Sequence, residues 1–291
     1  MKRKHMIQWA LVLALAVGLL SGCDSHQNPI PTQQSPETTP ATTAAPVPTQ
    51  SQPPQTEAVT EPAPTVPPTQ PTEPEPPLME LSRKERFEVN VFLSNFSALW
   101  FHENALWDDD PANDVFYTET GSVEQLADFA WLYAKLNRNE ELEVIVLQDK
   151  YYYAFRLSIL DPIAEQFFGQ PLNKEALSAM ESEYYFLHED MVCGPAADGE
   201  SYMNMTVAEG VYDLGDGTLR VEFAVYDAWE FADVGGTVLD QELYYMTGEQ
   251  ARIDPDLRLH LTGTAVIRPH TLSNGRESYR LVSYELYAPA S

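Results

Sequence analysis

Cationic residues are scarce in this sequence, where 17 Lys+Arg stand against 44 Asp+Glu and the formal net charge at pH 7 is −27. Most of the imbalance lies in residues 78–291, which carry 14 Lys+Arg and 38 Asp+Glu. Phosphate groups are bound mainly by cationic side chains, so this shortage argues against nucleic acid and anionic phospholipid as partners of that region. The same charge favours a cationic partner.

Motifs with a known chemical mechanism are also missing from residues 78–291. The region has no glycine-rich phosphate loop and no Gly-x-Ser-x-Gly nucleophile elbow. His102-Glu103 lacks the second histidine four residues later that a zinc-protease helix needs. These absences predict no cofactor and favour a protein that binds rather than catalyses. Paired catalytic carboxylates leave no sequence signature, because they are recognised by their separation in space.

The amino-terminal residues form a pattern typical of exported proteins. Three cationic residues at positions 2–4 precede an apolar stretch at 6–20, which is shorter than the roughly 20 residues of a membrane span. The stretch ends in Leu-Ser-Gly-Cys at residues 20–23, which resembles the lipobox of bacterial lipoproteins. The resemblance implies a signal peptide at 1–22 and a lipidated Cys23, whose diacylglyceryl group (palmitate-type chains) anchors the protein to the outer face of the cell membrane. An ordinary signal peptide followed by a chance cysteine is the alternative.

Residues 24–77 differ in composition from the rest of the chain. Proline, threonine, glutamine and alanine dominate there, and lysine, arginine and aromatic residues do not occur. Such a tract cannot bury enough apolar surface to fold, so together with Cys23 it is predicted to be a disordered, semi-rigid stalk. Residues 78–291 are then the folded acidic domain. If lipid occupies Cys23, the second cysteine, Cys193, has no partner for a disulfide within the chain.

Helices are predicted at the start of the folded part. Residues 82–85 (Ser-Arg-Lys-Glu) and 122–125 (Ser-Val-Glu-Gln) read as capping boxes, each followed by apolar residues at helical spacing. Asp161-Pro162 predicts the start of a short helix that ends at Gly169. Between these helices, the pattern predicts two strands around Asp149-Lys150.

After residue 182 the pattern predicts strands throughout. Alternating residues flank Asp216-Gly217 and Asn274-Gly275, which are turn signals for two long hairpins, and a smaller hairpin is predicted at 184–194. The predicted fold class is therefore α+β, with amino-terminal helices packed on one face of a long, twisted antiparallel sheet.

Two further resemblances concern this region. The order of helices followed by strands resembles the cone-shaped helix-plus-curved-sheet folds of the NTF2-like group. The segment VNVFLSNFS at residues 89–97 is similar to a segment that recurs in lipoproteins of Gram-positive gut bacteria. Neither resemblance carries a chemical motif, so neither implies an activity.

Clustered aspartates are the candidate metal ligands. Asp108, Asp109, Asp110 and Asp114 lie within seven residues, and carboxylate oxygens are the ligands that calcium prefers. Their spacing does not match the EF-hand pattern. A solvated loop in which Asp110 begins a turn before proline is the alternative. The sequence therefore predicts no defined metal site and leaves these four residues as weak candidates.

Two other groups of residues are candidates for a site. His188 and Cys193 could face each other across the small hairpin, as in a nucleophile pair, or Cys193 could be an ordinary buried thiol. Tyr152, Tyr185 and Tyr245 each lie in a tyrosine run, where a strand would expose one ring and bury its neighbour. Exposed tyrosines can bind sugar or protein, and cross-strand pairing that stabilises the sheet is the alternative.

The sequence as a whole predicts a membrane-anchored, extracytoplasmic lipoprotein with no catalytic activity. Its domain would bind an envelope or extracellular partner such as a wall component, a glycan or a cationic protein. The alternative function is a carboxylate-dependent hydrolase of the cell envelope acting on glycan or peptide.

Overall fold

The computed structural model describes residues 75–103, 115–182, 184–196, 203–232 and 239–288. These residues belong to one compact unit, Pro74–Ser291. The predicted signal peptide, the lipidation site Cys23 and nearly all of the stalk lie outside the described residues, as do the candidate metal ligands Asp108, Asp109, Asp110 and Asp114. Predictions about them stay predictions.

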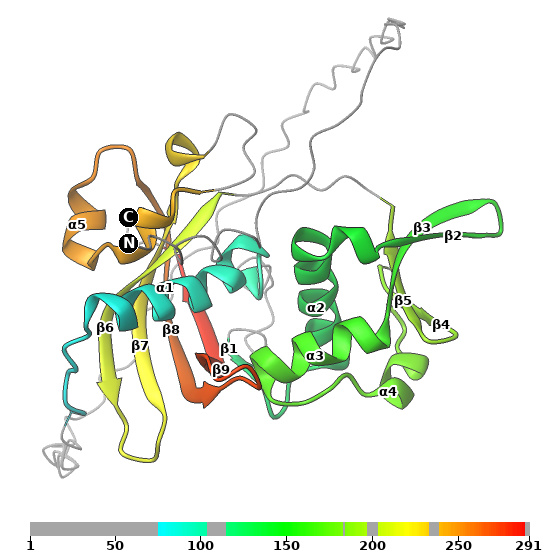
Figure 1. Cartoon of the computed structure of the whole chain (residues 1–291), viewed down its shortest axis with the longest axis horizontal. Helices are drawn as coiled ribbons and strands as arrows, with labels where there is room; N and C mark the ends of the chain where they lie inside the picture. Colours follow the sequence, from blue (N-terminus) through cyan, green and yellow to red (C-terminus); the bar gives the residue numbers. More distant parts are fainter. Residues whose placement is uncertain (1–74, 104–114, 183, 197–202, 233–238, 289–291) are drawn as a thin grey trace, which may run out of the picture. The chain divides into compact units, whose positions relative to one another are not determined.

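The described part contains both helices and antiparallel sheets, which confirms the α+β fold class (Figure 1). The α-helices are α1 (Arg83–Ala98), α2 (Val123–Asn137), α3 (Leu157–Phe168), α4 (Lys174–Ala179) and α5 (Gly248–Ile253), with short 3-10 helices η3 (Asn139–Glu141), η4 (Trp229–Phe231) and η5 (Gln241–Tyr245). The strands are β1 (Val115–Tyr117), β2 (Glu143–Leu147), β3 (Lys150–Arg156), β4 (Phe186–His188), β5 (Met191–Pro195), β6 (Asn204–Asp213), β7 (Leu219–Asp227), β8 (Arg258–Thr271) and β9 (Glu277–Tyr287).

The strands form two sheets, so the prediction of one long sheet is wrong. The larger sheet has the order β1-β9-β8-β7-β6 and the smaller one β2-β3-β5-β4. β2–β3 and β4–β5 are both hairpins, and β3 pairs with β5, so these four strands form a sheet of their own. Within the described residues, no helix has both the length and the apolar character for a membrane crossing.

Both predicted capping boxes are present and begin the two longest helices. The Ser82 hydroxyl accepts from the N–H of Glu85, whose carboxylate accepts from the N–H of Ser82, and α1 follows. Ser122 and Gln125 make the same reciprocal pair before α2. The predicted start of α3 is wrong, because the helix begins four residues before Asp161 and contains Pro162. Asp161 does not cap it and instead accepts from the N–H of Leu172 at 3.1 Å.

The region after residue 182 contains helices as well as strands, which the sequence did not predict. η5 and α5 lie between the two long hairpins and pack on a second apolar cluster. Their cluster includes Met205 and Val207 of β6, Tyr226 of β7, and Leu243 of η5. Short helical turns have no clear apolar period, so the sequence pattern does not reveal η5 and α5. Both long hairpins occur as predicted, with positive φ at Gly217 and Gly275 in their turns.

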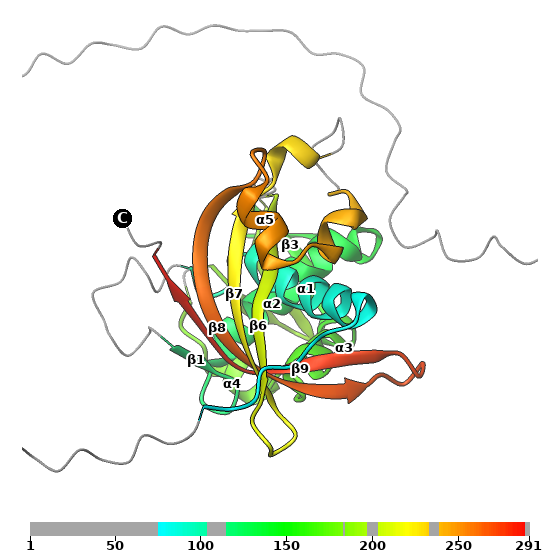
Figure 2. The same cartoon turned by 90° about the vertical axis from the view of Figure 1, so that its left-hand side faces the viewer.

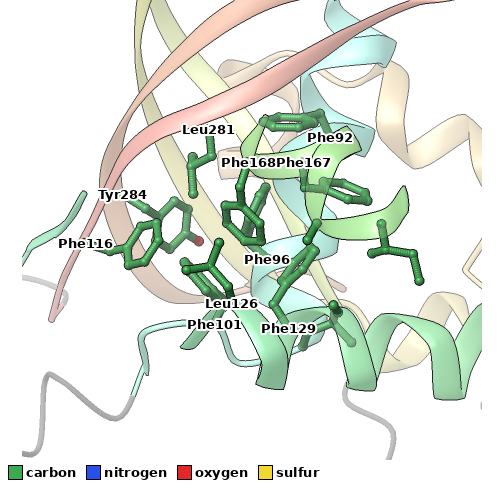
Figure 3. Packing of buried hydrophobic residues seen from close by; sticks show 14 of the residues in the cluster. Phe92, Phe96, Phe101, Phe116, Leu126, Phe129, Phe167, Phe168, Leu281 and Tyr284 are labelled. Atoms are coloured by element: carbon green, nitrogen blue, oxygen red, sulfur yellow. The ribbon is translucent and has the colours of Figure 1, made fainter. Parts of the chain in front are cut away.

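Aromatic rings fill the main core, which joins the two sheets through α1, α2 and α3 (Figure 3). Phe96 of α1 lies at its centre, with ring centroids 4.8 Å from Phe129 of α2 and 5.6 Å from Tyr284 of β9. Phe167 and Phe168 reach the same place from α3. Offset and edge-to-face pairs of this kind add to the stability that apolar burial provides.

The polar residues of α1 form bonds with an edge strand of the larger sheet. β6 ends the sheet, and α1 lies alongside it (Figure 2). The N–H of Ala208 donates to Asn90 Oδ1 at 2.8 Å, and the N–H of Thr206 donates to Ser94 Oγ at 2.9 Å. Ser97 Oγ accepts from the Thr206 hydroxyl at 2.8 Å. The segment VNVFLSNFS thus has a structural role, because its polar residues at helical spacing close a sheet edge.

The rest of the β6 edge is closed by the chain entering the domain. The N–H of Met79 donates to the carbonyl of Val211 at 2.8 Å, and the N–H of Asp213 donates to the carbonyl of Pro77. Leu78 forms an isolated bridge with Tyr212. Both halves of β6 therefore have partners for outward-facing backbone groups, namely the N–H groups of Thr206, Ala208 and Asp213 and the carbonyl of Val211.

Candidate functional site

Edge strands are where a fold leaves backbone groups unpaired, and three of the four edges in this domain are closed or very short. β6 is closed by α1 and residues 77–79, as described above, while β1 and β4 are only three residues long. Among the four terminal strands β2 is the exception, although residues 277–282 of β9 also extend beyond the residues paired with β1. β2 has five residues, and within the described part of the chain its outer side has no strand partner. Long open edges invite pairing with another chain, so soluble proteins usually protect them.

The register of the β2–β3 hairpin shows which backbone groups are open. Leu147 pairs with Lys150 across a two-residue turn, where Gln148 and Asp149 have φ of 51° and 63° as a type I′ turn requires. Hydrogen-bonded pairs alternate along an antiparallel ladder, so residues 143, 145 and 147 bond to β3. The N–H and C=O groups of Val144 and Val146 consequently point outward. We call these groups the β2 edge.

The side chains beside the β2 edge are apolar and exposed. Val144 is 58% exposed and Val146 is 55% exposed. Val146 lies opposite Tyr151, which is 67% exposed, so all three share one face of the sheet. Figure 1 shows the hairpin projecting beyond α2 and α3. An exposed apolar strip next to unpaired backbone groups is typical of an interaction surface.

Carboxylates stand at both ends of the β2 edge. Glu140 lies before β2 and is exposed, and Asp149 lies in the turn. Two other nearby carboxylates already have cationic partners, since Glu141 pairs with Arg138 at 3.1 Å and Glu143 with Arg156 at 2.7 Å. Lys150 is the cation of the turn.

The three candidate tyrosines have different environments. Tyr152 is half-buried with its ring edge-on to Phe186 at 4.9 Å, so it belongs to the packing of the small sheet. Tyr185 is buried and hydrogen-bonds with Asp128, whose pKa is raised by burial, and the exposed ring of this run is that of Tyr184. Tyr245 lies in a 3-10 helix rather than a strand, stacked on Phe87 at 4.6 Å. Of the three, only Tyr152 lies next to β2, opposite Ile145 and on the other face of the sheet from Val144 and Val146.

His188 and Cys193 are not directly opposite each other in the small hairpin. Cys193 pairs with Phe186, and His188 pairs with Met191. Cys193 is fully buried, and its burial raises the thiol pKa to about 11. A thiol that holds its proton so strongly is a poor nucleophile, so this geometry favours the interpretation of Cys193 as an ordinary buried residue.

A carboxylate–histidine pair that sequence reasoning missed joins Glu103 to His260 of β8. Their Oε1 and Nε2 atoms are 2.9 Å apart, with the Glu103 side chain 7% exposed and that of His260 39%. His260 is the extra residue of a β-bulge, because Val225 pairs with Leu261 and Tyr226 with Leu259. Bulges are common beside active sites because they redirect a side chain. The two residues are 157 positions apart, so no local pattern could have revealed the pair.

Strained backbone positions Glu103 for this contact. Trp100 and His102 have φ of 56° and 62°, a left-handed conformation that bulky residues rarely adopt. The intervening Phe101 is buried in the aromatic core, which holds the turn in place. Such strain often accompanies a functional site. The carboxylate could orient the His260 ring so that its second nitrogen acts as a general base toward water.

A cavity of about 220 Å³ opens beside His102 and Ser122, close in sequence to this pair, but its described walls do not include Glu103 or His260. Among the described residues, no hydroxyl or thiol is hydrogen-bonded to His260, and no three His, Cys, Asp or Glu side chains are grouped as metal ligands would be. The pair could activate water, but the described residues around it supply neither a nucleophile bonded to His260 nor a third metal ligand.

Comparisons with protein-family models, curated proteins and solved structures find no match for this chain. The expected likeness to NTF2-like folds is therefore not supported. What the protein does has to be argued from its own residues.

Proposed function

We propose that this protein is a lipid-anchored module on the outer face of the cell membrane that binds a cationic protein partner and catalyses no reaction. The β2 edge carries the proposal, because it combines unpaired backbone groups with exposed apolar side chains. The same fold closes its β6 edge with four side-chain and main-chain partners, namely Asn90, Ser94, Pro77 and Met79. An edge that no described residue closes, in a domain that closes a comparable one, is a place where a partner can pair.

The charge of the chain supports a cationic partner. A net charge of −27 attracts cations over distances of about a Debye length, roughly 10 Å at 0.1 M salt. Association should therefore slow as ionic strength rises, while the apolar contact at β2 should set the dissociation rate. The lipid and the stalk would hold the module near its partner.

Anchoring is tested by replacing the lipobox cysteine. Cys23→Ala should release the protein from the membrane fraction or leave the uncleaved precursor. Cys193→Ala, the matched control, should keep the mature protein in the membrane fraction. Mature Cys23→Ala protein that stays membrane-bound, together with negative lipid labelling of the wild type, would contradict the anchor.

Binding is tested on the full chain with probes of defined charge. A small cationic protein, the same protein with acetylated lysines, wall fragments and neutral glycans are compared at low and high salt. The cationic protein should bind with an association rate that falls with salt, and its acetylated form should bind at least tenfold more weakly. Equal binding of both forms would contradict the proposed charge selectivity.

The Glu103–His260 pair favours a second function, a carboxylate-dependent hydrolase acting on glycan or peptide. A buried carboxylate that orients an imidazole can activate water. Chromogenic glycoside, ester and peptide substrates test it. Turnover that is lost in Glu103→Gln but kept in the exposed control Glu119→Gln would establish the hydrolase and overturn the binding-only function.

A further inference from the structure

We infer that the β2 edge binds its partner by strand addition: an extended segment of the partner continues the small sheet as a fifth strand. The segment has apolar residues at alternate positions and cationic residues at its two ends. This inference rests on the proposed function and names the partner's chemistry. It follows from the outward backbone groups, the exposed side chains and the nearby charges of β2.

The backbone supplies four hydrogen-bonding groups, because Val144 and Val146 each direct one N–H and one C=O outward. Their spacing of two residues matches the repeat of an added strand. Neighbouring edge groups at 143, 145 and 147 are engaged with β3. Main-chain bonds of this kind give affinity for any extended peptide, and the side chains then select among peptides.

The side chains at β2 define which residues the added strand should carry. Partner residues directly opposite Val144 and Val146 would lie on the same face as these valines and Tyr151, so apolar side chains fit there. Residues between them would lie on the opposite face. That face carries Ile145, Leu147 and Lys150, so cationic residues fit best in the segments that flank the added strand, near Glu140 and Asp149 at the two ends of β2.

A second copy of this chain fits the edge less well. Each copy carries a net charge of −27, so two copies repel each other at the distances where a cationic segment is attracted. Glu140 and Asp149 at the ends of one β2 would also meet the same residues of the other. Self-pairing is therefore an outcome that the experiment has to detect.

The experiment selects peptides on the full chain and then removes the outward donor of one residue. A random ten-residue peptide library is panned, and binding of the recovered peptides is measured for wild type, Val146→Pro and Val146→Thr. Proline removes the outward N–H of residue 146 and no bond to β3, whereas threonine keeps the backbone and the shape. Recovered peptides should carry apolar residues at alternate positions and cationic residues near their ends. Val146→Pro should weaken their binding at least tenfold, and Val146→Thr less than threefold.

A measurement on wild type keeps the test independent of how the variants fold. Amide hydrogen exchange at Val144 and Val146 should slow at least tenfold when a recovered peptide is added. Peptides without the alternation, unchanged exchange at both valines, or unchanged affinity in Val146→Pro would overturn strand addition. So would a dimer of the chain that dissociates in Val146→Pro. If no peptide is recovered but the cationic protein still binds, strand addition fails while the proposed function stands; if neither binds, both fail.

Discussion

The two longest edge strands of this domain differ in whether side chains of the protein bind their outward-facing backbone groups. β6 has ten residues, and its outward N–H groups at Thr206 and Ala208 are bound by side chains of α1 inside the protein. β2 has five residues, and its outward groups at Val144 and Val146 lie among exposed side chains. Both are edges of antiparallel sheets, so the difference does not arise from sheet type.

Comparing the two strands shows that the closed edge depends on polar side chains at buried positions. Asn90 is fully buried and also donates to the carbonyls of Tyr244 and Met246, at 2.9 and 3.3 Å. A buried amide is tolerated only when its hydrogen bonds are made, and this one makes three. No equivalent residue of the described chain reaches the outer side of β2, so that edge can receive an external strand.

The largest effect is expected when the closed edge is opened at Asn90. Asn90→Ala leaves the N–H of Ala208 and two carbonyls without partners in the interior, which should lower the free energy of unfolding by about 3 kcal/mol. Denaturant unfolding monitored by tryptophan fluorescence measures it. Asn95→Ala is the control, because the bonds of Asn95 within the described residues are to Val91 and Phe92 of its own helix, and the change should cost no more than about 0.5 kcal/mol. Equal losses in the two variants would show that Asn90 does not hold the edge.

A smaller effect is expected at Ser94. Ser94→Ala removes one acceptor, that of the Thr206 N–H, and creates little empty space, so unfolding should become easier by about 1.5 kcal/mol. The amide of Thr206 should then exchange faster with solvent, while that of Ala208, which is bound to Asn90, should change less. If the exchange rates of both amides rose equally, the hydrogen bonds between α1 and β6 would be breaking together rather than one residue at a time.

The interior of the small sheet should resist change even though its edge is open. Cys193→Ala should destabilise by about 1 kcal/mol, since it removes one buried sulfur. The native thiol should alkylate slowly at pH 8, because with a pKa of about 11 only about one thiol in a thousand is ionised there. In the unfolded chain the pKa of this thiol is near 9. The stability gained by keeping the buried thiol protonated should therefore decline as pH rises from about 9 towards 11. Rapid alkylation of the native chain at pH 8 would instead revive the pairing with His188.

The smallest effect on stability is expected at the open edge. Val146→Lys replaces an exposed side chain that packs little, so the free energy of unfolding should change by less than about 0.5 kcal/mol. Binding of a cationic partner should nevertheless be lost, because the new charge repels it and removes apolar contact. Leu259→Lys, at an exposed position of the larger sheet, should leave binding intact. Loss of binding in both variants would place the interface elsewhere.

Features that depend on neighbouring residues could be predicted from the sequence. The capping boxes at Ser82 and Ser122 and the turns at Asp216-Gly217 and Asn274-Gly275 need only a few residues to specify them, and the structure has all four. The division into two sheets could not be predicted, because the pairing of β3 with β5 depends on residues about forty positions apart.

Much of the candidate site could not be predicted from the sequence for the same reason. The alternation in EVIVL, the sequence of β2, predicts a strand. An edge strand and a central strand can show the same alternation. Whether Val144 has a partner depends on every other strand of the sheet. The Glu103–His260 contact likewise depends on a strained turn and a bulge far away in the chain. The lipobox at Cys23 remains a prediction from sequence alone.

Amide hydrogen exchange in the free, wild-type chain tests the contrast between the two edges most directly. The N–H groups of Thr206 and Ala208 should exchange only when the domain unfolds, because buried side chains bind them. Those of Val144 and Val146 should exchange orders of magnitude faster, close to the rate of an unprotected strand. Equal protection of all four amides in the free chain would contradict the account, since β2 would then already have a partner.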